Sequence, residues 1–285
     1  MADEGVSLGI SFSGNNIYYA VSDDIQKGSL KHIGRIELNF TILEAILSSS
    51  HELCSHISKV INRLRDSYSP SQVKIITYPQ LECWTTVPKL VYDDSKEREA
   101  HLAFLINGLE RQNIETYWYD MSNQDFRFLT IRDRSVMKVI ENFVPGFPNT
   151  EFCSDFEVGL QWVQHSGARG SFLSLSCNPH TITISSYLLG KLRAATCLRF
   201  KHIDDLPYIW KQSERHLKWM KGYHEEILLF GSKTSRVIEM LRPFWDGSAE
   251  ITVMDNLADM KANAEEQTYS FPLEEAFPAI MMAAR

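Results

Sequence analysis

The 285-residue sequence lacks several motifs that identify large enzyme classes. It contains no G-x-x-x-x-G-K-[ST] phosphate loop, no G-x-G-x-x-G dinucleotide fingerprint and no H-E-x-x-H zinc motif. Each of these motifs brings phosphate-binding backbone or metal ligands together on one local turn or helix. Their absence argues against P-loop and Rossmann nucleotide enzymes and against zinc metalloproteases.

Cysteine, positive charge and long apolar runs are also scarce. The five cysteines are odd in number and form no C-x-x-C pair, which argues against a disulfide framework and a structural zinc site. Lys and Arg total 29 against 36 Asp and Glu, so the net charge of −7 argues against nucleic-acid binding by the whole chain. No apolar stretch is long enough for a membrane span, and Met1–Gly5 is too polar and acidic for a signal peptide. We therefore expect a cytoplasmic protein with reduced thiols.

A repeated order of elements is the most informative feature of the chain. Each half opens with three strands joined by tight turns and continues with a helix, a strand, a helix and a further strand. The opening strands are predicted at 6–12, 17–21 and 32–38 in the first half and at 171–176, 181–188 and 192–200 in the second. Long helices follow at 50–68 and 206–221, and the first half contains further strands at 85–91, 116–119 and 126–131. An offset of about 160 residues indicates a duplicated domain rather than a solenoid.

The Pro/Gly cluster at 144–148 is the best candidate for a domain boundary. We therefore predict an α/β fold with an N-terminal lobe at 1–150 and a C-terminal lobe at 151–273, followed by a short apolar helix within 274–285. Each lobe would contain a mixed sheet opened by a three-strand meander and flanked by helices. Two such lobes leave a cleft between them, where ligands usually bind.

Five segments make the chain resemble the actin-like ATPase superfamily. Ser7–Gly14 and Phe172–Thr181 stand where the family places its two phosphate hairpins, and Leu228–Ser232 stands where it places the adenosine glycines. Phe152–Leu160 resembles the interdomain helix and Ala276–Ala284 the closing helix. The chain is most similar to a degenerate bacterial branch, which includes PilM, the cytoplasmic domain of GspL and an uncharacterised family of the same fold. The resemblance implies a duplicated RNase H-like fold whose closing helix packs back on the first lobe.

The metal chemistry of that superfamily is missing from the matching positions. Family ATPases carry an aspartate at the end of each first strand, and the two carboxylates hold hydrated Mg²⁺ against the phosphates. Here the first hairpin offers Ser13, Gly14 and Asn15, and the second offers Ser176–Pro179. We expect no catalytic residue, no metal site and no hydrolysis. Weak ATP or ADP binding can persist at the degenerate pocket positions, which are Ser13, Gly14, Asn15, Asn178, Gly231, Ser232 and Lys233.

The leading hypothesis is a non-catalytic, pseudo-ATPase binding or scaffold protein. It would act through homodimerisation or by docking a partner protein in or beside the cleft, as the resemblance to PilM implies. Exposed aromatic residues suit such an interface, and the candidates are Trp219, which falls off the apolar stripe of its helix, and Tyr117 and Tyr119 in the run 117–119.

Two other interpretations remain open. An ATP-dependent phosphotransferase or ATPase would need relocated acids, for which Asp23, Asp155 and Asp204 are candidates. An RNA-associated protein would use a basic helix face formed by Lys211, Arg215, Lys218 and Lys221. The acid pairs 93–94 and 204–205 can serve in acid–base chemistry, but their position at helix starts favours capping.

Overall fold

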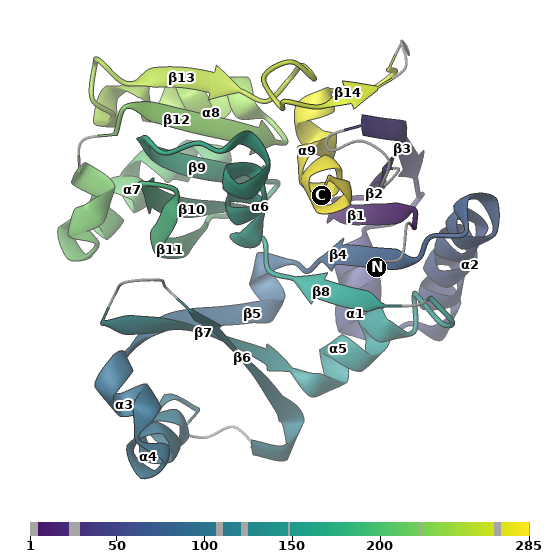
Figure 1. Ribbon diagram of the computed structural model, residues 1–285, viewed down its shortest axis with the longest axis horizontal. Coiled ribbons are helices and arrows are strands. Elements are labelled where there is room, and N and C mark those ends of the chain that lie inside the picture. The colour runs from purple at the N-terminus through teal and green to yellow at the C-terminus, as the bar shows by residue number, and fades with distance from the viewer. Residues whose placement is uncertain are drawn as a thin grey trace.

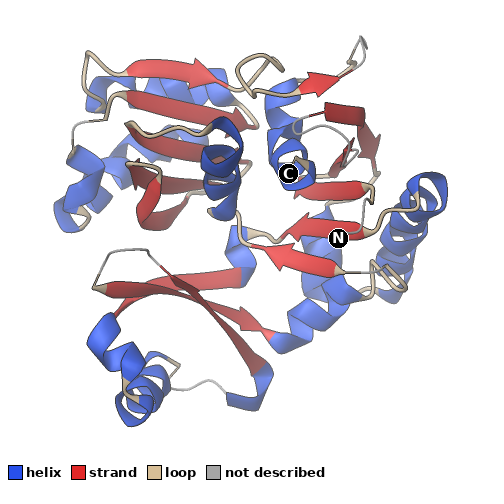
Figure 2. Ribbon diagram, in the orientation of Figure 1, coloured by secondary structure: helices blue, strands red, loops and turns tan. Residues whose placement is uncertain are grey.

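The computed structural model describes residues 5–22, 29–106, 111–120, 125–147, 149–222, 224–264 and 269–284. These residues form three β-sheets with helices packed on them (Figures 1 and 2). Two sheets build the two lobes, and the smaller third sheet lies beneath them at the lower left of Figure 1.

The first lobe is built on a six-stranded mixed sheet. Its strands are β1 (Ser7–Ser13), β2 (Asn16–Ser22), β3 (Ser29–Glu37), β4 (Gln72–Ile76), β8 (Thr150–Cys153) and β14 (Asn263–Ala264). They lie in the order β14-β3-β2-β1-β4-β8. β1, β2 and β3 form an antiparallel meander, and β4 pairs with β1, and β8 with β4, in parallel. The β1–β2 turn contains Gly14 with a φ of +60°, which glycine adopts without steric cost.

The second lobe is built on a five-stranded mixed sheet. Its strands are β9 (Ser171–Asn178), β10 (Thr181–Leu188), β11 (Lys191–Arg199), β12 (Glu226–Gly231) and β13 (Glu250–Val253). They lie in the order β11-β10-β9-β12-β13. β9, β10 and β11 again form an antiparallel meander, and β12 and β13 extend the sheet in parallel.

The two lobes repeat one arrangement of strands. The order β3-β2-β1-β4-β8 in the first sheet matches β11-β10-β9-β12-β13 in the second. In each lobe a helix crosses from the meander to the first parallel strand, namely α2 (His51–Tyr68) and α7 (Leu206–His216). The predicted α/β fold, with a meander opening the mixed sheet of each of two lobes, is confirmed.

The third sheet is a unit that the sequence did not predict. Its strands β5 (Glu82–Pro88), β6 (Ile114–Asp120) and β7 (Phe126–Asp133) pair in the antiparallel order β5-β7-β6. Helices α3 (Lys89–Asp93) and α4 (Ser95–Leu105) connect β5 to β6. The strands were expected within the first lobe, but in the chain they stand between β4 and β8 and pair only with one another among the described residues.

Helices cover both faces of each lobe sheet. α1 (Ile42–Ser48), α2 and α5 (Arg134–Glu141) share one apolar core with the first sheet. α7 and α8 (Thr234–Leu241) share a second core with the other sheet. A third core joins the inner faces of the two sheets through α6 (Glu157–Ser166) and α9 (Leu273–Ala283). The lobes are thus joined by a continuous apolar layer, which is worth about 25 cal/mol for each Å² of apolar surface that it buries.

The C-terminal helix α9 packs directly against β1 and β2 of the first lobe and β12 of the second (Figure 1). Gly9 of β1 permits the approach, because a Cβ there would lie 2.0 Å from the Ala279 carbonyl oxygen of α9. α9 is apolar and buried along most of its 11 residues. Among the described residues, α9 included, no helix combines the length and apolar character needed to cross a bilayer.

One local feature differs from the sequence prediction and another agrees with it. The helix expected over 206–221 ends at His216 and is followed by a 3-10 turn at 218–221, because Leu217 leaves the helical region with φ −100° and ψ 77°. The acid pair at 93–94 caps as expected, since Asp94 Oδ1 accepts hydrogen bonds from the Lys96 and Glu97 amides at 2.8 and 3.1 Å.

Candidate functional site: the interlobe cleft

The ends of the first strands of both lobes meet across a narrow space between the lobes. The cavity measures about 20 Å³, room for one water molecule, whereas ligand pockets usually exceed about 300 Å³. It is lined by Ser11, Phe12, Ser13, Ile76, Thr77, Tyr78, Pro79, Asp155, Ser176, Cys177, Asn178, Gly231, Glu275 and Pro278. Residues of β1, β4, β9, β12 and α9 therefore converge here, as the duplicated topology dictates.

The second hairpin is fixed to the end of β12 by a close backbone contact. Gly231 has a φ of +94°, and a Cβ at this position would lie 2.1 Å from the Cys177 carbonyl oxygen. The Ser232 amide donates to the same carbonyl at 2.7 Å. The contact uses a backbone acceptor of the hairpin and explains why glycine stands at position 231.

Asp155 is the buried acid of the cleft. It follows β8, and its Oδ1 accepts a hydrogen bond from Ser176 Oγ of β9 at 2.9 Å. Burial raises the pKa of Asp155 to about 6, while hydrogen bonding by Thr183, Ser176 and Asn178 acts in the opposite direction. The linker acid is thus bound to the second lobe by a hydroxyl group.

Glu275 of α9 is the other carboxylate that lines the cleft. Its Oε2 accepts a hydrogen bond from the Tyr18 hydroxyl of β2. Each of the two acids therefore already has a hydroxyl donor within the protein. Among the described residues, no group of three or more His, Cys, Asp or Glu side chains is placed to hold a metal ion.

The structure brings only some of the predicted pocket positions together. Ser13, Asn178 and Gly231 line the cleft. Asn15 instead supports the first hairpin, since its Nδ2 donates to the Leu38 carbonyl at 3.0 Å.

The remaining predicted positions lie outside the cleft lining. The Gly14 carbonyl accepts from the Ile42 amide at the start of α1. Ser232 Oγ donates to the Cys177 carbonyl at 3.4 Å. Lys233 is exposed and has the left-handed φ of +58° at the start of α8.

The three acids proposed for the enzyme hypothesis do not lie together at one site. Asp23 lies outside the described residues. Asp155 is at the cleft, as above. Asp204 is exposed in the second lobe and accepts from Arg236 at 2.9 Å.

Two of the aromatic residues proposed for an interface contact other side chains of the same molecule. Tyr119 donates its hydroxyl to Glu157 Oε1 at 2.7 Å. Tyr117 is 38% exposed, and the Arg132 guanidinium lies 4.6 Å from its ring centroid. Trp219 is half-buried and lines a groove between the third sheet and the second lobe.

The basic helix face is reduced by an internal acid. Lys211 and Lys221 both approach Glu214 Oε2, at 3.4 and 3.9 Å. Glu214 is buried and also accepts from Trp210 Nε1 at 2.9 Å. Two of the four cations expected to face a nucleic acid therefore have a carboxylate partner.

A buried polar network beside the cleft was missed by the sequence analysis. Arg132 Nε of β7 donates to Glu82 Oε1 of β5 at 2.7 Å, with both side chains fully buried. Arg132 also donates to the Phe152 carbonyl and to Ser154 Oγ, each at 3.0 Å. The network thereby fastens the third sheet to the segment that joins the lobes.

Glu157 extends the same network into the first turn of α6. Its Oε1 accepts from the Ser154 amide at 2.6 Å and from Tyr119. Burial raises the pKa of Glu157 to about 7, and these hydrogen bonds and Arg132 counteract the rise. Spacing rules could not have found the contacts of Arg132, because Glu82, Phe152 and Ser154 are separated from it by 20 to 50 residues.

One further spacing match has a structural explanation. Gly5–Gly9 fits the G-x-S-x-G pattern of serine hydrolases. Ser7, however, lies within β1, is fully buried and is paired with Ser22 of β2. It is therefore not an exposed nucleophile on a strand-to-helix turn.

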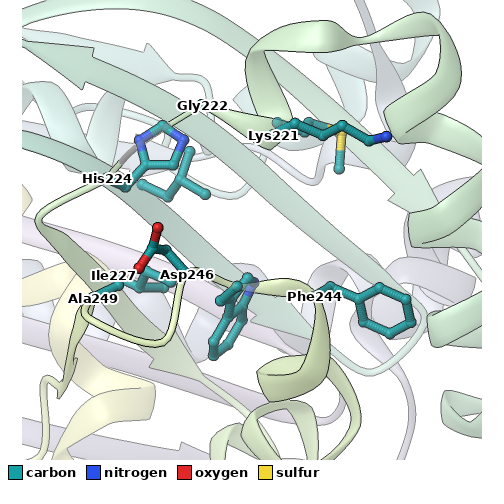
Figure 3. Close-up of a pocket in the computed structure, with 10 residues that line it drawn as sticks. Lys221, Gly222, His224, Ile227, Phe244, Asp246 and Ala249 are labelled. Atoms are coloured by element: carbon teal, nitrogen blue, oxygen red, sulfur yellow. The ribbon is translucent and has the colours of Figure 1, made fainter.

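A larger cavity of about 450 Å³ lies within the second lobe (Figure 3). In that view His224 and Asp246 face each other, and Lys221 and Phe244 also line the cavity. Burial lowers the pKa of His224, which favours its neutral form. All the lining residues belong to the second lobe, so this cavity is separate from the interlobe cleft.

No protein-family model and no curated protein matches the chain. Solved structures do match. PilM–PilN, a type IV pilus biogenesis complex, has a chain with a TM-score of 0.68 at 10% identity, covering 98% of this chain and 97% of that chain. A Bacteroides thetaiotaomicron protein with an actin-like ATPase fold and unknown function has a TM-score of 0.54 at 15% identity, covering 92% and 100%.

The cytoplasmic domain of EpsL, an inner-membrane component of the Vibrio cholerae type II secretion system, has a TM-score of 0.52 at 10% identity, covering 90% and 92%. At such identities the likeness concerns the fold alone. The chain therefore has the actin-like ATPase fold expected from its two hairpins and its repeated order of elements.

Proposed function

We propose that this chain is a non-catalytic protein of the actin-like fold, a pseudo-ATPase, that acts by binding a partner protein or a second copy of itself. Its place would be the cytoplasm, in keeping with five unpaired cysteines. Protein binding is also the activity suggested by the PilM–PilN complex, in which a chain of the same fold is found with a partner.

The observation that carries the proposal is the composition and the small volume of the interlobe cleft. Serine, glycine and asparagine stand at the hairpin ends, where the family ATPases place metal-binding aspartates. The remaining space of about 20 Å³ is far too small for a nucleoside triphosphate. Opening it would separate Ser176 from Asp155 and expose part of the apolar layer around α9.

An ATPase or phosphotransferase is the second candidate, and Asp155 is the observation that favours it. Asp155 and Glu275 both line the cleft, and carboxylates are the ligands that Mg²⁺ prefers. To act as an ATPase or phosphotransferase, the protein would have to open the cleft between its lobes. Asp155 and Glu275 would then have to exchange their hydroxyl donors for a metal ion.

Measuring the release of inorganic phosphate from Mg·ATP distinguishes the pseudo-ATPase from the ATPase. We expect the wild type and Asp155→Asn to give the same background rate. Phosphate release that depends on Mg²⁺ and is lost in Asp155→Asn would support the enzyme instead. Sedimentation velocity on the same samples measures whether the protein forms homodimers.

A further inference from the structure

Two unpaired edge strands border one groove between the third sheet and the second lobe. β5 is an edge of the third sheet, and β11 is an edge of the five-stranded sheet. Within the described residues neither strand has a hydrogen-bonded neighbour on its outer side. A groove of about 410 Å³ separates them and is lined by Trp84, Thr85, Thr86, Phe126, Phe128, Arg193, Ala194, Ala195, Thr196, Leu217 and Trp219. In Figure 1 the second lobe stands above the third sheet.

The two edges are held together at one end. Gln80, which precedes β5, donates from Nε2 to Thr181 Oγ1 of β10 at 3.3 Å. Arg199, the last residue of β11, donates to the Gln80 carbonyl at 3.4 Å. These contacts bridge the sheets, so the width of the groove is set by the fold itself.

The groove runs along the β11 edge and over one face of the third sheet. Consecutive residues 193–196 of β11 line it, with Arg193 at the bulge in the β10–β11 pairing. On the side of the third sheet it is lined mainly by Trp84 and Thr86 of β5 and by Phe126 and Phe128 of β7, which alternate along their strands and therefore share one face. All five residues from 193 to 197 are half-buried, without the alternation seen where one face is covered. Ala194 and Ala195 are too small to screen the backbone groups of β11, and such edges are templates for another strand.

The chemistry of the walls specifies the incoming strand. Aromatic and aliphatic side chains dominate the lining, and Arg193 is its one charged residue among those described. Arg193 forms no ion pair with any described residue, and its Nε is buried without a hydrogen-bond partner. A buried donor of this kind costs free energy until an acceptor reaches it, and a carboxylate is the strongest acceptor.

We propose that this β5–β11 groove binds an extended, acidic segment of a partner protein, which adds as a strand to the β11 edge. A carboxylate of the segment would pair with Arg193, and its alternate apolar side chains would contact Trp84 and Trp219. Backbone hydrogen bonds would supply affinity and the side-chain contacts specificity, as in other strand additions. A second copy pairing by the same edge would bring another Arg193 and no carboxylate. The inference rests on the proposed function and names the surface and the chemistry of its partner.

Peptide display tests the groove with the folded full-length chain. Random twelve-residue peptides are selected separately on wild type, Arg193→Gln, Arg193→Glu and the matched control Lys191→Gln. Lys191 begins the same strand but does not line the groove, so its variant loses the same charge elsewhere. Circular dichroism confirms the fold of each variant. Hydrogen exchange of wild type with its best peptide then locates the contact.

We expect the peptides selected on wild type to carry Asp or Glu between alternating apolar residues and to protect the backbone amides at 193–196 from exchange. Their affinity should fall about tenfold or more in Arg193→Gln and be unchanged in Lys191→Gln. Arg193→Glu should select basic peptides instead, a gain that a misfolded variant cannot imitate.

Three results would overturn the inference. The first is that the selected peptides bind all four proteins equally. The second is that the peptide protects only the backbone amides of other strands from exchange. The third is that no peptide is selected on wild type. Self-association that is abolished by Arg193→Gln would assign the groove to a second copy instead. All of these leave the pseudo-ATPase proposal standing, whereas Mg-dependent phosphate release would overturn that proposal without affecting the groove.

Discussion

Ser176 of β9 donates a hydrogen bond to Asp155, the acid that follows β8, and the 2.9 Å contact joins the second lobe to the interlobe segment. The carboxylate stands in a cleft with space for about one water molecule. In this position it closes the cleft, although an acid here could also have served a metal ion.

Asp155 should make stability depend on pH. Burial raises the pKa of Asp155 in the folded state to about 6, above about 3.9 in the unfolded chain. The folded state then binds the proton more tightly, so the contribution of Asp155 to stability is greatest below pH 4 and is lost as the pH rises to about 6 and above. About two pKa units correspond to about 3 kcal/mol.

Asp155→Asn removes this titration. Unfolding by urea at pH 4, 6 and 7.5 should show that the free energy of unfolding of the variant rises relative to that of wild type, by about 2.4 kcal/mol between pH 4 and pH 7.5. A difference that stays constant over this range would mean that Asp155 titrates normally.

Removing one member of the buried Glu82–Arg132 pair should lower the free energy of unfolding. Arg132→Met leaves the Glu82 carboxylate buried without its cation, which typically costs about 3–5 kcal/mol. Replacing both residues, as in Glu82→Leu with Arg132→Met, should recover part of that loss, because no charge is left buried but Trp84 Nε1 and Ser154 Oγ lose their partners.

Arg134→Met is the matched control, because Arg134 pairs with Glu115 at 3.4 Å near the surface. We expect Arg134→Met to lower the free energy of unfolding by about 1 kcal/mol or less. The account of the network is wrong if both arginine variants lose similar amounts, or if the double variant is less stable than Arg132→Met alone.

Gly9 should tolerate no side chain. A Cβ at Gly9 would lie 2.0 Å from the Ala279 carbonyl oxygen and 2.7 Å from the Ala283 amide nitrogen of α9. Gly9→Ala must therefore displace α9 from β1, and we expect a loss of about 3 kcal/mol or more from overpacking.

Gly14→Ala provides the comparison. Gly14 has a positive φ but no atom within 4 Å of the added Cβ, so only backbone strain of about 1 kcal/mol is expected. Thermal denaturation of both variants checks the contrast. Equal losses would mean that the packing of α9 on β1 does not decide the stability of this region.

The sequence contained enough to predict the two lobes. Short alternating strands separated by turn residues such as Gly14 and Gly190 fix a meander locally, and the same order occurs twice. The apolar C-terminal helix was equally visible, because a run with so few charges must be buried. These features depend on neighbours in the sequence, which is why periodicity found them.

The third sheet and the closed cleft could not be found in the same way. The strands at 82–88 and 126–133 have ordinary strand patterns, and nothing local says which sheet they join. Arg132 and Glu82 lie 50 residues apart, and each alone resembles a surface charge. The hydrogen bond of Ser176 to Asp155 depends on how the lobes approach, which is a property of the whole apolar core.

The most direct test of the central claim is the unfolding temperature measured in Mg·ATP, in Mg·ADP, in ATP with EDTA and without nucleotide. A ligand that binds the folded state raises the midpoint by mass action, by about 2.7 kcal/mol in stability at 100 times its Kd. We predict no Mg-dependent shift at millimolar nucleotide. A large rise with Mg·ATP that EDTA abolishes, and that Asp155→Asn lacks, would contradict the account.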